Sequence, residues 1–156
     1  MPLLTGIGFS QHEDAALAVH HATRAAKQQL NRDRIDAAIV FNTVHYNTKD
    51  FLPMLYKALD QTKVVGASCV GLVLSEGIAM RGLGVLALHS ENIRFETGCV
   101  ENLDTQFPDA AGEALAQNYT ADFGEHHRKF VLLFCDGLLN TFSPFLQALQ
   151  SRLNPG

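Results

Sequence analysis

The sequence lacks a long apolar run, a basic cluster and a leader-like start. No apolar stretch approaches the ~20 residues that span a bilayer, and the opening Met-Pro-Leu-Leu-Thr-Gly has no basic region followed by an apolar core. The 12 Lys and Arg residues are scattered and are outnumbered by 16 Asp and Glu, for a net charge of -4. Because nothing here attracts a polyanion, these absences predict a chain with neither a membrane nor a nucleic-acid partner.

Cysteine is also scarce. The three cysteines, Cys69, Cys99 and Cys135, are an odd number and lie in or beside apolar segments. This pattern argues against a disulfide framework and for reduced thiols. We therefore expect a cytoplasmic protein, with Cys99 and Cys135 as strand and core residues.

Cofactor motifs are missing as well. There is no Walker A lysine motif, and Gly82-Leu83-Gly84 lacks the third glycine and the following helix of a dinucleotide site. The adjacent histidines His20-His21 and His126-His127 would point about 100° apart on a helix, so neither pair can chelate one metal by itself. The sequence predicts no cofactor and no metal.

What is present describes a globular chain. Its 156 residues are 47% hydrophobic and 18% charged, which suits one domain over residues 1–156. A chain of this length can bury about two-thirds of its unfolded surface. It can therefore form a sizeable core.

Apolar runs predict the strands, and capping signals predict the helices. Strands are expected over residues 3–9, 35–41, 64–67, 82–88, 93–100 and 130–135. Helices are expected to begin at Ser10, Asp50 and Thr141, with another over 109–117. Only three residues separate 82–88 from 93–100, so these two strands should form a hairpin. The expected class is α/β, with a mixed, mainly parallel sheet, helices packed on it and an antiparallel hairpin portion.

Polar and small residues follow three of these strands. Open α/β sheets place ligands at the carboxyl ends of their strands, and glycines there let a ligand approach the backbone. The candidates for a ligand site are Asn42, Thr43 and His45; Gly66, Ser68 and Cys69; and Asp136. Hydroxyl and amide groups at such an edge suit a small polar molecule.

Cys69 allows a catalytic alternative. The run from Gly66 to Gly71 is not a nucleophile elbow, because Val70 stands where that motif needs glycine. Cys69 could still act as a nucleophile with His45 as its base, which requires a thiolate stabilised within hydrogen-bond reach. A buried cysteine is more often a small hydrophobe.

Several stretches resemble the N-terminal part of a FIST domain, named for F-box and intracellular signal transduction. They are residues 39–41, 64–73 and 84–88, with Gly66, Ser68 and Gly71 as the Gly-x-Ser-x-x-Gly turn after a short apolar strand. The similarity extends from about Gly6 to Pro155.

The resemblance implies a cytoplasmic sensory domain that binds small ligands such as amino acids and passes a signal to partner domains. No catalytic residues come with it, so we expect no enzyme. Members of the family continue into a C-terminal FIST domain, and this chain stops at Gly156. We therefore expect a partial FIST N-terminal domain, with a protein–protein interaction domain as a further alternative.

Overall fold

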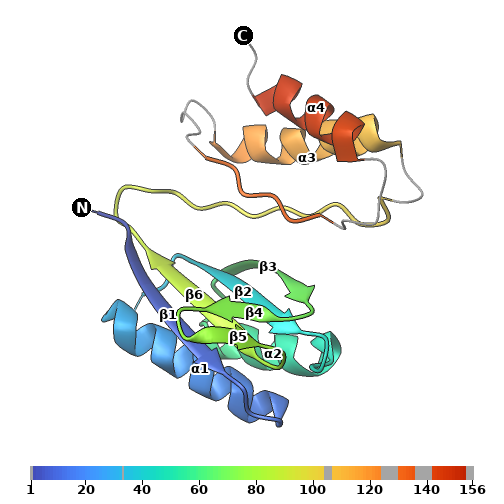
Figure 1. Cartoon of the computed structure of the whole chain (residues 1–156). Helices are drawn as coiled ribbons and strands as arrows, with labels where there is room; N and C mark the ends of the chain where they lie inside the picture. Colours follow the sequence, from blue (N-terminus) through green and yellow to red (C-terminus); the bar gives the residue numbers. More distant parts are fainter. Residues whose placement is uncertain (1, 33, 104–106, 124–129, 136–141, 154–156) are drawn as a thin grey trace. The chain divides into compact units, whose positions relative to one another are not determined.

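The computed structural model describes residues 2–32, 34–103, 107–123, 130–135 and 142–153, with the backbone alone for 118–123. The chain divides into two compact units, residues 1–95 and 96–156 (Figure 1). That both belong to one domain stays a prediction.

The first unit is an α/β structure. In chain order its elements are β1 (Leu4–Ser10), α1 (Ala15–Leu30), β2 (Ala37–Thr43), α2 (Thr48–Ala58), β3 (Lys63–Cys69), β4 (Leu72–Leu74), β5 (Gly77–Ala79) and β6 (Leu83–His89). The main sheet has the order β1-β6-β2-β3, and β4 and β5 form a separate antiparallel pair. β2 and β3 are parallel, whereas β6 runs antiparallel to both of its neighbours. The predicted α/β class and mixed sheet are confirmed.

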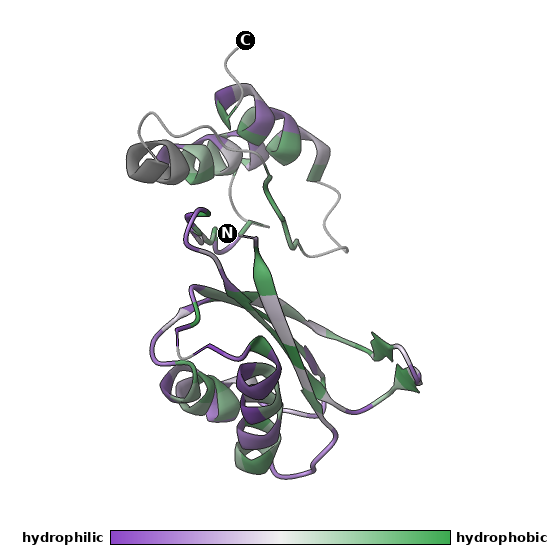
Figure 2. Cartoon of the chain, turned by 90° about the vertical axis from the view of Figure 1, so that its left-hand side faces the viewer, coloured by the Kyte–Doolittle hydropathy of each residue, from purple (hydrophilic) through white to green (hydrophobic). Residues whose placement is uncertain are grey.

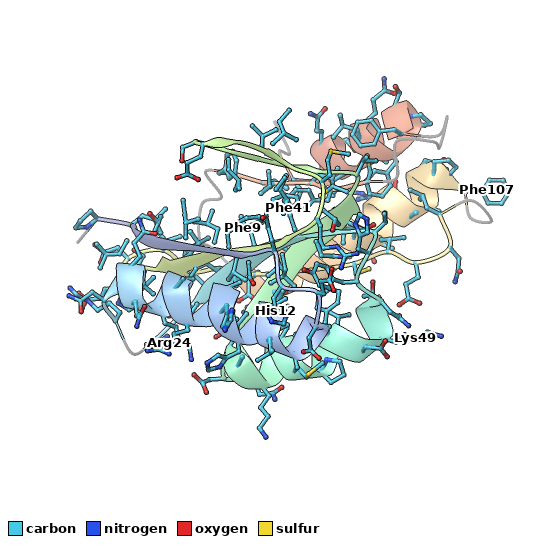
Figure 3. All side chains as sticks on the ribbon, turned by 60° about the horizontal axis from the view of Figure 1, so that its bottom comes forward. Phe9, His12, Arg24, Phe41, Lys49 and Phe107 are labelled. Atoms are coloured by element: carbon cyan, nitrogen blue, oxygen red, sulfur yellow. The ribbon has the colours of Figure 1, made fainter. Side chains whose placement is uncertain are left out.

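Both helices pack on one face of this sheet (Figure 1), where they form the core with buried residues of β2 and β6. α1 lies very close to β1. The closeness is clear at Gly8, where an added Cβ atom would clash with the backbone carbonyl of Ala22. Ala22 and Ala26 of α1 are both fully buried. Their small side chains allow the helix backbone to come this close to the strand. Figure 3 shows Phe9 and Phe41 on the opposite face of the sheet, and Figure 2 colours the strands mostly as apolar.

The expected start of the first helix is wrong. Asp14 caps α1, since its side chain accepts a hydrogen bond from the amide of Leu17 at 2.9 Å. Ser10 is the last residue of β1, and its hydroxyl accepts a long hydrogen bond of 3.3 Å from the amide of His12. Because the strand continues through Ser10, a helix cannot begin there.

The second helix also begins at a different residue. Asn47 caps α2 by accepting a hydrogen bond from the amide of Lys49 at 3.1 Å, so the expectation that Asp50 is the cap is wrong. Asp50 lies in the first turn instead, where its charge favours the helix dipole.

The second unit is a pair of packed helices, α3 (Pro108–Phe123) and α4 (Phe142–Leu153). The predicted helix over 109–117 is confirmed within α3, while the expected cap Thr141 lies outside the described residues. Phe145, Leu149 and Leu153 of α4 are buried together with Ala111 and other residues of α3. This unit therefore has a small core of its own.

Two strands that the sequence predicts after residue 90 are absent from the structure of the described residues. The structure assigns no strand to residues 93–100 or 130–135, so the hairpin of 82–88 with 93–100 is wrong. The physical reason is that β6 already has β1 on one edge and β2 on the other. Cys99 and Cys135 are exposed, which corrects their expected place in the core.

Within the described residues, no helix combines the length and the apolar character needed to cross a membrane.

Candidate functional site

Three strand ends meet at one edge of the main sheet. Because β1 and β2 are both antiparallel to β6, and β3 is parallel to β2, the three strands run in the same direction. Their last residues, Ser10, Thr43 and Cys69, therefore lie at the same edge (Figure 1). This is the edge at which open α/β sheets place ligands.

The register brings polar residues into one row across the strands. Asn42 lies opposite Ser68 on β3 and opposite Leu83 on β6, and Leu83 in turn lies opposite Ser10 on β1. Residues directly opposite each other project to the same face of a sheet. Ser10, Asn42 and Ser68 therefore share the face that α1 and α2 cover.

Ser10 is the residue that the sequence reasoning missed as a site candidate. The capping pattern predicts a helix start at Ser10, whereas the alternation of Gly6, Gly8 and Ser10 places all three on one face of a strand. That alternation is the signal that could have placed Ser10 at the sheet edge.

Thr43 joins β2 to the start of β6. It is fully buried, and its hydroxyl accepts a hydrogen bond from the amide of Gly82 at 3.1 Å. Its own amide donates to the Gly82 carbonyl at 2.9 Å. The Nδ1 atom of His45 lies 3.2 Å from the same hydroxyl. Thr43 therefore holds the edge together and has no exposed side chain to offer a ligand.

Asn42 and Gly66 are also constrained by their neighbours in the sheet. Asn42 is 6% exposed, and its side-chain amide donates to the carbonyl of Thr43 at 3.1 Å. A side chain at Gly66 would meet the carbonyl of Val40, so glycine is needed where β3 pairs with β2. Ser68, by contrast, is exposed, and so is His45.

A buried tyrosine connects two loops at this edge. The hydroxyl of Tyr46, in the loop after β2, donates to the carbonyl of His12, in the loop after β1, at 2.6 Å. Tyr46 is 4% exposed, and burial raises the pKa of its hydroxyl. His12 lies beside the N-terminal end of α1 in Figure 3. This hydrogen bond fixes the spacing of the two loops that border the edge.

Cys69 has the environment of a neutral thiol. Burial raises the pKa of its thiol, and a hydrogen bond from the backbone of Gly71 opposes that shift only in part. The thiol donates to the carbonyl of Asn42 at 3.5 Å. A low thiol pKa is what a nucleophilic cysteine needs, so this environment does not activate Cys69.

Asp136, the third-strand candidate, lies outside the described residues. Among the residues that are described, no group of three or more His, Cys, Asp or Glu could hold a metal ion.

The opposite edge of the same sheet carries an open cavity of about 360 Å³. It is lined by Arg34, Ile35, Asp36, Asp60, Gln61, Thr62 and Lys63. Its charged side chains already have partners: Asp60 pairs with Lys27 at 2.9 Å, and Asp36 pairs with Arg34 at 2.7 Å. This cavity is therefore a weaker candidate for a ligand site.

Asp36 has further partners at the end of β6. Its Oδ2 atom accepts a hydrogen bond from the amide of Ser90 and lies 2.8 Å from Nδ1 of His89, at a contact distance without hydrogen-bond geometry. Burial by itself would raise the pKa of Asp36, but the Ser90 amide and the charges of Arg34 and His89 together hold it below the ordinary value.

Comparison with known proteins gives one family. The FIST N domain matches residues 36–156 of the chain. No curated protein matches. A solved structure, the empty FtsZ dimer of M. jannaschii, is 15% identical over 64% of this chain and 34% of that chain, with a TM-score of 0.32. The chain thus spans about a third of that protein's length, and the low TM-score means that this similarity supports no conclusion.

Proposed function

Because the chain belongs to the FIST N domain family, a family of signal-transduction sensory domains, we propose that it is an input domain that binds a small ligand. We place the ligand at the edge where β1, β2 and β3 end. The ligand class is a small polar molecule such as an amino acid, and the bound state is passed to a partner domain.

The observation that supports this proposal is the row of polar side chains across three strands that run in the same direction. Ser10 and Asn42 are almost fully buried and would form the floor, while the exposed Ser68 and His45 are accessible to a ligand. Thr43 and Gly66 would act indirectly, by holding the strands at their present spacing. A small polar ligand needs a few hydroxyl, amide or imidazole groups for its orientation.

The proposal assigns no chemical step. The environment of Cys69 favours the neutral thiol, and the ring of His45 contacts Thr43. We therefore propose a binding function for these residues in place of catalysis.

Thermal unfolding of the chain against a panel of amino acids and small carboxylates tests the proposal. A ligand at 100 times its dissociation constant adds about 2.7 kcal/mol to the free energy of unfolding. For a chain of this length that is a rise in Tm of roughly 5–10 °C. Ser68→Ala should reduce a saturable shift, because it removes the exposed hydroxyl of the row.

Ser75→Ala is the matched control, because Ser75 is an exposed serine in the β4–β5 turn and belongs to none of the three strands. It should leave the ligand-induced shift unchanged. A shift that both variants reduce equally, or that neither reduces, would place the ligand elsewhere. No shift with any compound would count against a small polar ligand.

A further inference from the structure

The β4–β5 hairpin has an exposed apolar face. Val73 and Ile78 lie directly opposite each other in its register and are 83% and 72% exposed. Met80, just after β5, is 58% exposed. The other face is turned inward, where Ala79 is 3% exposed. Exposed apolar side chains gathered on one short element mark an interaction surface.

The hairpin also has a free edge. Each of its strands is three residues long, and an isolated two-stranded hairpin is marginally stable in water. In the part of the chain that the structure describes, β5 pairs with β4 alone. Residues 77–79 are Gly-Ile-Ala, with none of the lysines or prolines that protect edge strands from pairing. β5 is therefore open to a further strand.

We propose that this strand is β5 of a second copy of the chain, paired antiparallel about a two-fold axis at Ile78. The axis places Ile78 of one copy against Ile78 of the other, and Gly77 against Ala79. A two-fold axis perpendicular to the sheet keeps the same face outward in both copies. The result is a four-stranded sheet made of two hairpins.

The side chains fit this arrangement. On the outward face, the side chains form one row across the four strands. In order they are Val73 and Ile78 of one copy, followed by Ile78 and Val73 of the other. Directly opposed β-branched side chains stabilise the pairing of two antiparallel strands. Gly77 and Ala79, which alternate with Ile78, are small and do not hinder the approach of the two backbones.

The charges favour a second copy in the antiparallel orientation. Glu76 lies at the turn of the hairpin, and Arg81 lies just beyond its base. An antiparallel pairing brings the turn of one hairpin to the base of the other, so each Glu76 approaches an Arg81. Within its own chain, Arg81 lies 3.9 Å from Glu13, a long contact between side chains that are 40% and 88% exposed. Arg81 can therefore turn toward a second copy at little cost.

Cysteine crosslinking tests the register directly. In a chain with Cys99 and Cys135 replaced by serine, Ile78→Cys should oxidise to a disulfide-linked dimer, because opposed residues at the axis are within disulfide distance. Val73→Cys is the matched control. It has a similar exposure and the same outward face, but its counterpart lies three strand spacings away, roughly 14 Å. The serine background without a new cysteine shows what Cys69 contributes.

Equal crosslinking through Val73→Cys, or none through Ile78→Cys, would overturn the proposal. The first result would indicate packing of the two faces on each other, and the second would leave β5 unpaired between copies.

Sedimentation equilibrium of the unaltered chain provides the second test, with a reversible, concentration-dependent dimer expected. Glu76→Arg or Arg81→Glu alone should weaken dimerisation by roughly two- to fivefold, and the double variant should restore it, because the charge pair is then reversed. A chain that stays monomeric at every concentration would overturn the proposal. Neither experiment uses a ligand, so its outcome is independent of the proposed sensory function.

Discussion

Cys69 is the residue whose chemistry most directly separates binding from catalysis. Burial raises the pKa of its thiol, so less thiolate is present at neutral pH than in a free cysteine. We expect alkylation of Cys69 to be slow, with a pH midpoint above the ordinary value of ~8.5. The measurement is the rate of alkylation against pH in the Cys99→Ser/Cys135→Ser chain, with the urea-unfolded chain as control. Rapid labelling with a midpoint well below the ordinary value would favour the enzyme with His45 as base.

Asp36 should make the stability of the chain depend on pH. Its folded-state pKa is lowered, so its contribution is present above the unfolded pKa of ~3.9 and is lost as the pH falls through the folded value. Asp36→Asn should lower the free energy of unfolding at neutral pH by about 1–3 kcal/mol, because the Ser90 amide loses a charged acceptor and Arg34 loses the opposing charge. Urea unfolding of both proteins measures this.

In acid the two proteins should become more alike, since protonated Asp36 is also uncharged. Asp60→Asn is the control. Asp60 pairs with Lys27, but its side chain is 74% exposed, so only a small change in the free energy of unfolding is expected. A difference between Asp36→Asn and the unaltered chain that stays constant from neutral to acid pH would contradict the assignment.

At the scale of elements, the close contact between α1 and β1 depends on glycine. Gly8→Ala would place its methyl group on the carbonyl of Ala22, so strand or helix must shift. We expect a loss of about 3 kcal/mol or more in the free energy of unfolding, measured by chemical denaturation. Gly84→Ala in β6 is the matched control, because the nearest atom to its methyl group would be 3.9 Å away. Equal losses in both variants would show that α1 does not pack as described.

At the scale of the whole molecule, each unit has its own apolar cluster. Leu149 is 2% exposed in the cluster formed by α3 and α4. Leu149→Ala should destabilise that helix pair by about 2–5 kcal/mol. Hydrogen exchange should then accelerate in α3 and α4 while the amides of β2 and β6 keep their protection. Equal loss of protection in both units would show that they unfold together.

The α/β class, the helix over 109–117 and the FIST family followed from apolar periodicity and from the stretch around Gly66, Ser68 and Gly71. The starts of two helices did not, because the serine and aspartate signals at Ser10 and Asp50 are common to several local structures. Caps are decided by where the preceding strand or loop ends.

The apolar segments, the small residues and the polar groups that follow strands can all be identified from the sequence. These are local properties, set by side-chain chemistry and spacing. The position of β6 between β1 and β2 is, by contrast, a property of the fold. It leaves no free edge of β6 for residues 93–100 and brings Ser10 into line with Asn42 and Ser68. Strand pairing joins residues far apart in the chain, and an apolar run does not specify its neighbours, so the order of the sheet and the membership of the site depended on the fold.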